Sequence, residues 1–262
     1  MLTALTRKVS PALGRCALEY LERQEIDIAQ ATRQHEQYEA CLAELGLHVI
    51  SLPAEPDLPD SMFVEDPAVV VDEVAIIARM GNQVRRAESD SVAKALSQFR
   101  PLRSLREPAT LEGGDVLRVG RTFYVGLSRR TNRAGIAQLA VDLDPYGYSV
   151  IPVEVRRCLH LKSGACYLDD QTILANRAWI DIAPFRDFRI VDVAPDEPGA
   201  ANVLAIDGVV VIPAAFPATA EILRGLGYNV RTLDISELMK AEAGVTCSSL
   251  IFETPKSPRV RV

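Results

Sequence analysis

The sequence predicts an α/β fold made of five strand-strand-helix-strand (ββαβ) units packed in a closed ring with pseudo-fivefold symmetry. Two patterns predict it. A helix, a glycine and an outlying strand recur in that order, and a pair of short apolar strands precedes each helix after the first. The outlying strands end near residues 52, 105, 153, 193 and 233, a spacing of roughly 40 to 53 residues. Repeats of this kind cannot bury their apolar faces alone, so they stack against their neighbours.

Each unit can be justified in turn from its apolar periodicity and its turn residues. The helix-strand pairs lie at 26–45 with 47–52, 89–99 with 102–105, 132–143 with 148–153, a weaker pair at 179–185 with 188–193, and 217–226 with 228–234. The apolar strand pairs lie at 67–80, 115–126, 166–175 and 202–213. In three of them a polar or glycine break separates two apolar runs, which is typical of a hairpin.

A doubly wound parallel sheet is the competing fold, because alternating strands and helices also produce it. The hairpins argue against it, and no glycine-rich phosphate loop follows the first strand. The nearest candidate, LEGGDVL at 111–117, precedes a strand instead of opening a helix. A length of 262 residues is compatible with one domain or two. We expect a single catalytic domain at 1–262.

The composition is typical of a globular protein that acts on small molecules. Hydrophobic residues make up 48% of the chain and charged residues 24%, which is enough apolar material for a packed core. A net charge of -6 argues against a nucleic-acid partner. No run of about 18 apolar residues predicts a membrane span, and Arg7, Lys8 and Arg15 interrupt the N-terminal stretch where a secretory signal would be apolar.

Cysteine usage points to a reducing compartment. The chain has five cysteines, an odd number, and no CxxC pair, so we expect free thiols and a cytoplasmic protein. No zinc-type ligand spacing occurs, and we expect no metal. Cys247 differs from the other four because AGVTCSSLIF places it between a glycine turn and a final apolar strand, among small neighbours that leave its sulfur accessible. Its thiol would be reactive only if its surroundings favour the thiolate.

There are three histidines, of which one is a candidate for catalysis. His35 is expected on the exposed side of a helix, and His48 beside the core. His160 opens HLKSG in a loop between two strands, where catalytic groups are often held on a rigid scaffold. A histidine there can serve as a general acid or base near neutral pH.

Acidic residues gather in DSMFVED at 60–66 and in LEGGD at 111–115. If the first segment is extended, Asp60 and Asp66 share one face, while Phe63 and Glu65 share the other. Clustered carboxylates beside an aromatic ring suit a planar cation, since a guanidinium presents five N–H donors that carboxylates accept in pairs. The sequence therefore favours an arginine-like ligand.

Five motifs occur in an order that resembles one enzyme family. They are DSMFVEDPAVV, LEGGDVL, GLSRRTN, HLKS and GVTCSS, and they span residues 60–249, with a looser match over IDIAQATRQHEQY. In this order and at these separations they are similar to the dimethylarginine dimethylaminohydrolases, which belong to the guanidino-modifying pentein superfamily. The resemblance implies the five-bladed pentein α/β propeller.

The resemblance also implies a role for each matching residue. Cys247 is similar to the nucleophile, His160 to the general acid and base, and Glu112 to the carboxylate that supports the histidine. The residues implied in substrate binding are Asp66 and Asp60 for the guanidinium, Glu65 and Phe63 for the pocket wall, Arg85 and Arg130 for the substrate carboxylate, and Leu18 and Ala241 for backbone contacts to the amino end. Arg86 and Arg129 are adjacent alternatives for the two arginines.

The implied activity is hydrolysis of asymmetric dimethylarginine or monomethylarginine to citrulline and a methylamine through a covalent thiouronium, without a cofactor. One alternative is an arginine deiminase-like hydrolase that releases ammonia, although that family has a longer chain. The others are a non-catalytic guanidino-binding pentein and a cysteine peptidase or amidase. The oligomeric state stays open, with a homodimer as one option, and so does any rim between Tyr167 and Asp196.

Overall fold

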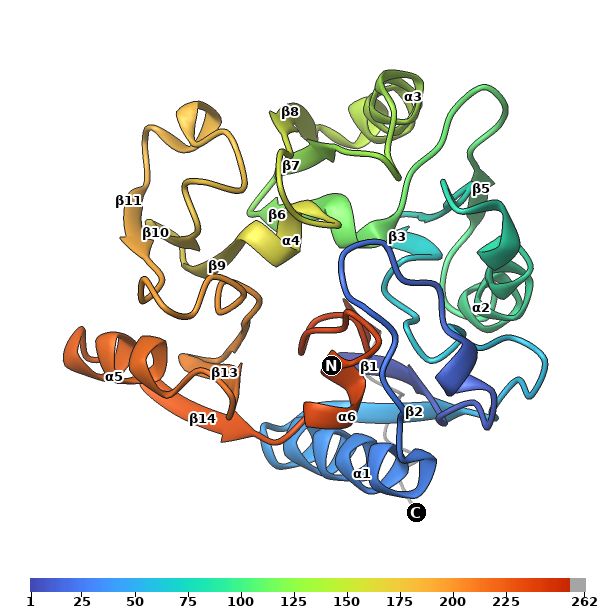
Figure 1. Cartoon of the computed structure of the whole chain (residues 1–262). Helices are drawn as coiled ribbons and strands as arrows, with labels where there is room; N and C mark the ends of the chain where they lie inside the picture. The colour runs from blue at the N-terminus through green and yellow to red at the C-terminus, as the bar shows by residue number, and fades with distance from the viewer. Residues whose placement is uncertain (255–262) are drawn as a thin grey trace, which may run out of the picture.

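Five three-stranded sheets surround a common centre in the computed structural model, which describes residues 1–254 (Figure 1). The sheets follow the chain in the order β15-β1-β2, β3-β4-β5, β6-β7-β8, β9-β10-β11 and β12-β13-β14. In each sheet the middle strand pairs antiparallel with one neighbour and parallel with the other. The predicted ring of five ββαβ units is confirmed.

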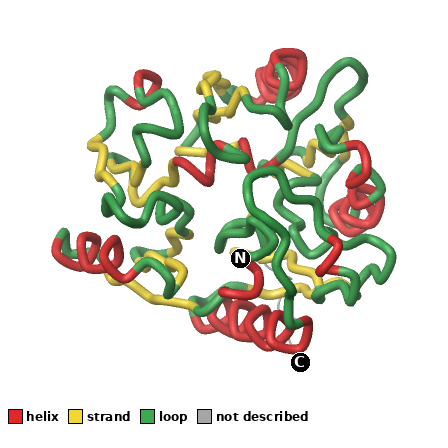
Figure 2. The backbone as a smooth tube through the Cα atoms, viewed as in Figure 1, coloured by secondary structure: helices red, strands yellow, loops and turns green. Residues whose placement is uncertain are grey.

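The longer helices lie on the perimeter, whereas the short helices at 161–164 and 236–239 lie nearer the centre (Figure 1 and Figure 2). The strands are β1 (Leu2–Arg7), β2 (His48–Leu52), β3 (Ala68–Val70), β4 (Ala75–Ile77), β5 (Leu102–Ser104), β6 (Val116–Val119), β7 (Thr122–Leu127), β8 (Ser149–Glu154), β9 (Ala165–Asp169), β10 (Thr172–Ala175), β11 (Arg189–Asp192), β12 (Leu204–Ile206), β13 (Val209–Pro213), β14 (Asn229–Leu233) and β15 (Leu250–Glu253). The helices are α1 (Ile28–Glu44), α2 (Glu88–Leu96), α3 (Arg133–Leu143), α4 (Leu161–Gly164), α5 (Pro217–Gly225) and α6 (Ser236–Met239). Short 3-10 turns are η1 (Leu13–Arg15), η2 (Gln83–Arg85), η3 (Gly113–Asp115), η4 (Asp144–Tyr146) and η5 (Ala183–Phe185).

Local chemistry sets the ends of the helices. α1 begins after Asp27, whose side chain accepts the N–H of Gln30 at 2.9 Å, and α3 begins after Asn132, which accepts the N–H of Gly135 at 2.8 Å. Past the end of α1, Gly46 takes a φ of 88°, a conformation that favours glycine. The boundaries that the sequence predicts for α1, α3 and α5 agree with the structure to within two residues.

The first and last described strands lie in the same sheet. β1 pairs antiparallel with β15 and parallel with β2, so the ring is closed by strands from opposite ends of the chain. The sequence predicts β15 as a final apolar strand but not β1, because Arg7 and Lys8 make the N-terminal segment resemble a polar lead-in. Arg7 is nevertheless buried, with hydrogen bonds to Pro53 O and Ser91 Oγ.

The fourth unit departs from the prediction. A helix is expected at 179–185, but only the 3-10 turn η5 forms there. Phe185 in this turn is fully buried, and its ring lies 4.5 Å from that of Tyr124. Pro184 lacks the backbone N–H that a longer helix would use. Aromatic packing therefore covers this sheet where a helix covers the others.

The predicted exposure of the other two histidines, His35 and His48, is reversed in the structure. His35, expected on the exposed side of α1, is 1% exposed, and His48, expected beside the core, is exposed at the start of β2. α1 lies over β2 and β14 and also packs against α6, so more of its surface is buried than one apolar stripe would indicate.

The core is divided among neighbouring sheets. One cluster joins β1 and β15 to β3, β4 and α2, and another joins β3 and β4 to β6, β7 and α3. The innermost strands also touch in succession, β15 with β3, β6 with β9 and β9 with β12. Among residues 1–254, none of the helices combines the length and the apolar character that a membrane crossing requires. The predicted single domain at 1–262 includes 255–262, which lie outside the described residues.

Candidate active site

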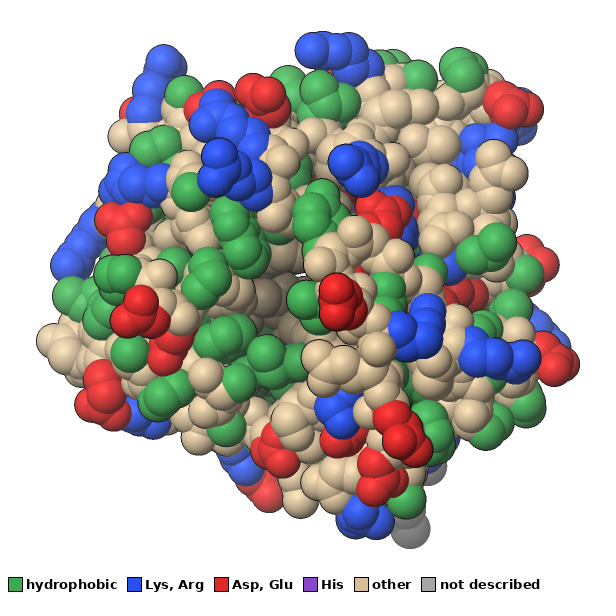
Figure 3. Space-filling view, viewed as in Figure 1, with side chains coloured by type: hydrophobic (Ala, Val, Ile, Leu, Met, Phe, Trp, Pro, Cys, Tyr) green, Lys and Arg blue, Asp and Glu red, His purple; other side chains and the backbone are tan. Residues whose placement is uncertain are grey.

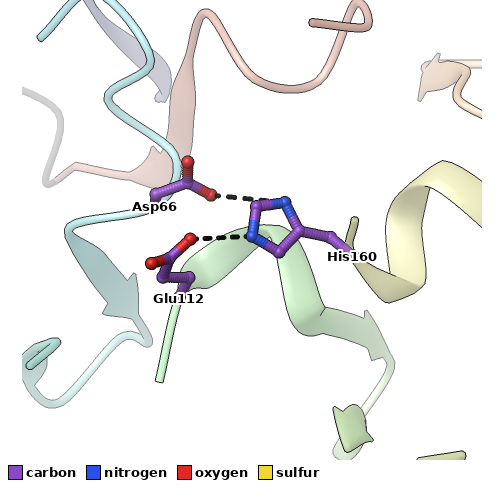
Figure 4. A group of neighbouring side chains, drawn as sticks. All are labelled: Asp66, Glu112 and His160. Atoms are coloured by element: carbon purple, nitrogen blue, oxygen red, sulfur yellow. Dashed lines mark hydrogen bonds and ion pairs between the residues drawn. The ribbon is translucent and has the colours of Figure 1, made fainter. Parts of the chain in front are cut away.

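Loops from several sheets meet near the centre of the ring, and three acidic or basic side chains lie together there. Figure 4 shows Asp66 from the loop before β3, Glu112 from the segment before η3, and His160 from the loop before α4. All three are at most 5% exposed. The structure therefore brings together residues up to 94 positions apart in the sequence (160 − 66).

His160 and Glu112 form a buried pair. His160 Nε2 lies 2.8 Å from Glu112 Oε2, and His160 Nδ1 faces Asp66 Oδ1 at 4.0 Å (Figure 4). Burial opposes protonation of the imidazole, but the charge of Asp66 and the bond to Glu112 raise the pKa of His160 to about 9. His160 is therefore an imidazolium at neutral pH, with Nδ1 on the side away from Glu112.

Glu112 stays ionised because positive groups surround it. Burial alone would raise its pKa, but the His160 hydrogen bond and the charges of Arg85 and Arg130 hold the pKa of Glu112 well below its usual range. Arg130 Nη1 donates to Glu112 Oε2 at 3.0 Å, and the backbone N–H of Asn82 donates to Oε1 at 3.0 Å. This carboxylate fixes the orientation of the imidazole and stabilises its charge.

Two glycines in LEGGD allow these groups to approach. A Cβ on Gly114 would lie 2.5 Å from His160 Nδ1 and 2.9 Å from Asp66 Oδ1, and a Cβ on Gly113 would lie 1.9 Å from Glu65 O. The N–H of Gly114 also donates to Asp66 Oδ1 at 3.0 Å. The absence of side chains at Gly113 and Gly114 therefore lets Glu65, Asp66 and His160 pack against this turn. Close packing accounts for the glycine pair, and no phosphate-binding loop is needed to explain it.

Cys247 lies in the loop before β15, three residues from the start of that strand. It is half-buried, and the N–H of Gly244 donates to its Sγ at 3.3 Å. Burial and the charges of Glu65 and Asp66 raise the pKa of the Cys247 thiol to about 12. The other four cysteines are buried free thiols. In the unliganded protein Cys247 is consequently a neutral thiol, and thiolate formation needs added positive charge.

Glu65 connects α4 and the loop at Thr246 to Cys247. It pairs with Lys162 of α4, and its Oε2 accepts from Thr246 Oγ1 at 2.8 Å. The backbone N–H of Glu65 donates to Cys247 O at 3.3 Å. Burial raises the pKa of the Glu65 carboxyl, while Lys162 opposes this shift.

The segment DSMFVED is not extended as predicted. Residues 59–67 form consecutive turns, with the N–H of Phe63 donating to Asp60 O at 2.9 Å and that of Asp66 to Phe63 O at 3.4 Å. The predicted alternation of faces is therefore wrong. Asp60 and Asp66 still interact, since the charge of Asp66 contributes to a raised pKa of Asp60, behind burial as the main cause. Phe63 packs in the same apolar cluster as Cys247 and Ala241.

The two candidate arginines are buried and ion-paired, whereas their neighbours are not. Arg85 bonds to Asp66 at 2.8 Å and to Glu88 at 2.9 Å, and Arg130 bonds to Glu112 at 3.0 Å and to Glu19 at 2.6 Å. Arg129 is exposed, and Arg86 is half-buried and donates to the carbonyl of Met80. This difference favours Arg85 and Arg130 over the adjacent positions as ligands of a substrate carboxylate.

A loop between η1 and α1 crosses over the site and carries Leu18 (Figure 1). The Glu242 carboxylate accepts three successive N–H groups of this loop, from Glu19, Tyr20 and Leu21, at 2.6–2.9 Å. The backbone N–H of Ala17 donates to Asp60 at 3.1 Å. A cleft of about 890 Å³ lies on one side of the loop, lined by Leu18, Asp60, Arg85 and Arg130 among others.

On its other side, the loop borders a second and mainly apolar cavity. This cavity has a volume of about 300 Å³, and its walls include Leu21, Trp179, Phe216 and Gly244. Figure 3 shows a hollow near the middle of this face, with hydrophobic side chains along its edge. The segments that precede His160 and Cys247 both contribute to the cavity wall, so it adjoins the candidate catalytic residues.

One cluster contains two carboxylates and an imidazole of the kind that bind metal ions, but these groups are already bonded to other groups of the protein. Ligand atoms of Asp66, Glu112 and His160 lie within 4.8 Å of one another. Asp66 is bonded to Arg85 and to the N–H of Gly114, and Glu112 is bonded to Arg130 and His160. The two carboxylates of this cluster are therefore already paired with cationic groups of the protein.

Sequence reasoning missed four residues that hold this site together. They are Lys162, Thr246, Asn202 and Glu242. Asn202 accepts the N–H of Thr246 at 3.1 Å and donates to Lys162 O at 3.0 Å, so it links the two loops beside the nucleophile. Lys162 stands in HLKS and Thr246 in GVTCSS, so the quoted motifs contained them. No sequence signal marks Asn202 or Glu242.

A family model described as "N,N dimethylarginine dimethylhydrolase, eukaryotic" matches residues 18–176. The chain is 37% identical over 228 residues to the N(G),N(G)-dimethylarginine dimethylaminohydrolase of Pseudomonas aeruginosa, covering 86% of this chain and 90% of that protein. It belongs to the dimethylarginine dimethylaminohydrolase family. The family member of that name from Streptomyces coelicolor is 39% identical over 248 residues, covering 94% of this chain and 95% of that protein.

A solved structure of the family agrees with the fold. A cysteine-to-serine variant of the dimethylarginine dimethylaminohydrolase from Pseudomonas aeruginosa, in complex with citrulline, superposes with a TM-score of 0.91 at 34% identity. The match covers 96% of this chain and 100% of that chain. The pentein propeller predicted from the motifs is thereby confirmed.

Proposed function

We propose that the protein hydrolyses Nω-methylated arginines, asymmetric dimethylarginine and monomethylarginine, to citrulline and dimethylamine or methylamine. One observation carries the proposal: His160, an ion-paired imidazolium, lies 4.0 Å from Asp66, and the charge of the same carboxylate helps to raise the pKa of the half-buried Cys247 thiol. The family relatives named for this activity support it. Binding a guanidinium here adds positive charge beside the Cys247 thiol, which favours its thiolate.

Substrate binding orders the guanidinium against the carboxylates. Asp66 and Asp60 accept its N–H groups, and Glu65 and Phe63 form the adjoining wall. Arg85 and Arg130 bind the substrate's carboxylate, while backbone groups at Leu18 and Ala241 contact its amino end. These contacts hold the central carbon about 3 to 3.5 Å from the sulfur, near the geometry of attack.

The first chemical step forms a C–S bond. The bound cation lowers the pKa of the Cys247 thiol, whose proton leaves to solvent, and the thiolate adds to the guanidinium carbon. His160 donates its proton from Nδ1 to the departing amine as the C–N bond breaks. The products of this step are dimethylamine or methylamine and a covalent thiouronium on Cys247. Glu112 stabilises the imidazolium before the transfer and orients the neutral ring afterwards.

The second step restores the enzyme. Neutral His160 accepts a proton from water as the oxygen adds to the thiouronium carbon. The C–S bond then breaks as the hydroxyl of the adduct loses its proton to solvent, which releases citrulline, and the leaving thiolate takes up a proton from solvent to restore the thiol. The residues of this chain supply every group that these steps use, and we expect no metal or organic cofactor. Five free thiols support a cytoplasmic location, and a homodimer stays a prediction.

A product assay tests the proposed substrate. Arginine, monomethylarginine and asymmetric dimethylarginine are offered side by side, and citrulline, ammonia and methylamines are measured. We expect citrulline with dimethylamine or methylamine, and little ammonia from arginine. Ammonia as the main product would assign the arginine deiminase alternative, and binding without product would assign the non-catalytic one.

Removing the sulfur tests the nucleophile. Cys247→Ser should lower kcat by at least about 10²-fold, because a hydroxyl is a far weaker nucleophile than a thiolate at this position. In the wild type, acid quenching during turnover followed by intact-protein mass spectrometry should trap the thiouronium on Cys247. Cys41→Ser, at a buried thiol outside the site, is the matched control. A Cys247→Ser variant with full activity would refute the assignment.

A further inference from the structure

Asp115 is a fully buried carboxylate that the proposed mechanism does not use. It is 0% exposed and ends the turn η3, three residues after Glu112. No arginine or lysine forms an ion pair with it among the described residues, and the cation that most affects it is His160. A carboxylate buried in this way lowers stability unless its neighbours compensate, so its presence calls for an explanation.

One oxygen of Asp115 holds the residue after the histidine. The N–H of Leu161 donates to Asp115 Oδ1 at 2.9 Å. Leu161 opens α4, and His160 precedes it directly. The same oxygen has no room around it, since a Cβ on Gly126 would lie 2.4 Å away. The backbone on which the imidazole is mounted is therefore fixed against a rigid acceptor.

The other oxygen of Asp115 holds the turn that carries Arg130. Ser128 Oγ donates to Asp115 Oδ2 at 2.6 Å and accepts the backbone N–H groups of Arg130 at 3.0 Å and Thr131 at 3.1 Å. Thr131 Oγ1 in turn accepts the N–H of Glu112 at 3.1 Å. One buried side chain thus connects the backbones of a candidate acid, its supporting carboxylate and a candidate substrate-binding arginine.

We propose that Asp115 is a positioning residue of this active site: its carboxylate aligns His160 and Arg130 with Glu112 and places a negative charge behind the imidazole. The proposal rests on the proposed function. Asp115 touches neither the substrate nor the reacting atoms. It acts through Leu161 on one side and Ser128 on the other, and the two effects can be separated by mutation.

The charge effect follows from what surrounds the histidine. The acidic groups that face His160 are Asp66 before β3, Glu112 before η3 and Asp115 within η3, while Arg85 and Arg130 face Glu112 from the other side. All three carboxylates favour the imidazolium. Removing the charge of Asp115 should lower the pKa of His160 by about 1 unit. A residue that only stabilised the fold would not move this titration in a protein that remains folded.

Asp115→Asn and Ser128→Ala test the two connections. The asparagine amide can still accept the N–H of Leu161, but its NH₂ faces a serine oxygen that already accepts two N–H groups, so the turn must shift. We expect Asp115→Asn to lower kcat by about 10- to 100-fold, as a misplaced catalytic group does, and to shift the His160 ring titration to lower pH. Ser128→Ala leaves the Asp115 carboxyl in place, and this carboxyl is ionised at the pH where His160 titrates, so the variant should raise KM several-fold through Arg130 and shift the His160 titration far less than Asp115→Asn does.

NMR of the unliganded protein gives the titration independently of turnover. Three histidines give few ring signals, and His160→Gln assigns the relevant one. If wild-type protein turns over no methylated arginine, the proposed function fails, while the effect of Asp115→Asn on the His160 titration can still be measured. The two failures are thus distinguishable.

Glu39→Gln is the matched control. Glu39 accepts hydrogen bonds from Thr6, Ser51 and Lys8, away from the site. The Glu39→Gln variant should therefore have a lower free energy of unfolding and an unchanged titration of the His160 ring. A folded Asp115→Asn with wild-type kcat and an unmoved titration would overturn the proposal. If Asp115→Asn does not fold, Ser128→Ala decides: an unchanged KM in that variant overturns the proposal, and a raised KM with unchanged kcat supports it.

Discussion

Among residues 1–254, the buried rings of His160 and His35 each lie beside a glutamate, the first in the candidate site and the second in α1, where Glu39 is half-buried. His160 Nε2 lies 2.8 Å from Glu112, and its Nδ1 faces Asp66. His35 Nε2 lies 3.2 Å from Glu39 Oε1 one turn along α1, but neither ring nitrogen makes a hydrogen bond among residues 1–254. Both rings are at most 5% exposed. Burial beside a carboxylate therefore does not define a catalytic histidine.

What distinguishes the two pairs is the second nitrogen. At His160 it points to a carboxylate that a cation can approach, next to a cleft and a thiol. At His35 neither nitrogen makes a hydrogen bond among residues 1–254, and Glu39 is already bonded to Thr6 and Lys8. The first pair retains a proton to transfer, whereas the second connects α1 to the strands below it.

The largest predicted difference is between the two histidine variants. His160→Gln should lower kcat by about 10² to 10⁴-fold, since it removes the general acid. His35→Gln should keep kcat near the wild-type value and lower the free energy of unfolding by about 1 kcal/mol. Product formation and urea unfolding measure the two effects. Equal loss of activity in two folded variants would contradict the assignment.

A methyl group added beside the His160 ring should lower kcat less than replacement of the imidazole does. Gly114→Ala places a Cβ 2.5 Å from His160 Nδ1, so the ring or the turn must move. We expect a loss of about 10- to 100-fold in kcat with the protein still folded. Gly14→Ala is the control, because nothing lies within 4 Å of its Cβ. Wild-type kcat in Gly114→Ala would show that the imidazole does not need the observed position.

The pKa of the His160 ring tests its predicted protonation state without an activity measurement. Its pKa is raised to about 9 from the usual 6.5, so NMR should find the ring protonated at pH 7 and half-titrated near pH 9. Because the folded-state pKa lies above the unfolded one, the stabilisation from this charge is fully present below pH 6.5 and is lost as the pH rises through about 9. Half-titration at or below pH 6.5 would rule out a resting imidazolium.

Local patterns were sufficient to predict the ring, because each unit repeats the same apolar periods and turn residues. They failed at β1, where charged residues are buried, and at η5, where aromatic contacts between sheets replace a helix. Both exceptions depend on partners distant in sequence. Periodicity within one segment cannot report such partners.

The sequence predicted the residues of the candidate site better than it predicted their local conformation. Motif order placed Cys247, His160, Glu112 and Asp66 in one site, and the geometry supports this grouping. The extended conformation expected for DSMFVED is wrong, since turns form there. The choice between Arg85 and Arg86 depends on which guanidinium is buried against a carboxylate. Glu242 could not be found at all, because its three N–H donors lie more than 220 residues away.

The pairing of β1 with β15 has a consequence for protein synthesis. A ribosome releases the segment around Cys247 only just before the strand that completes the ring. Until β15 docks on β1, the loop that carries Cys247 lacks the strand that anchors it in the ring. A chain cut before β15 therefore keeps the side chains of Cys247 and His160 but loses the strand pairing that closes the ring around them.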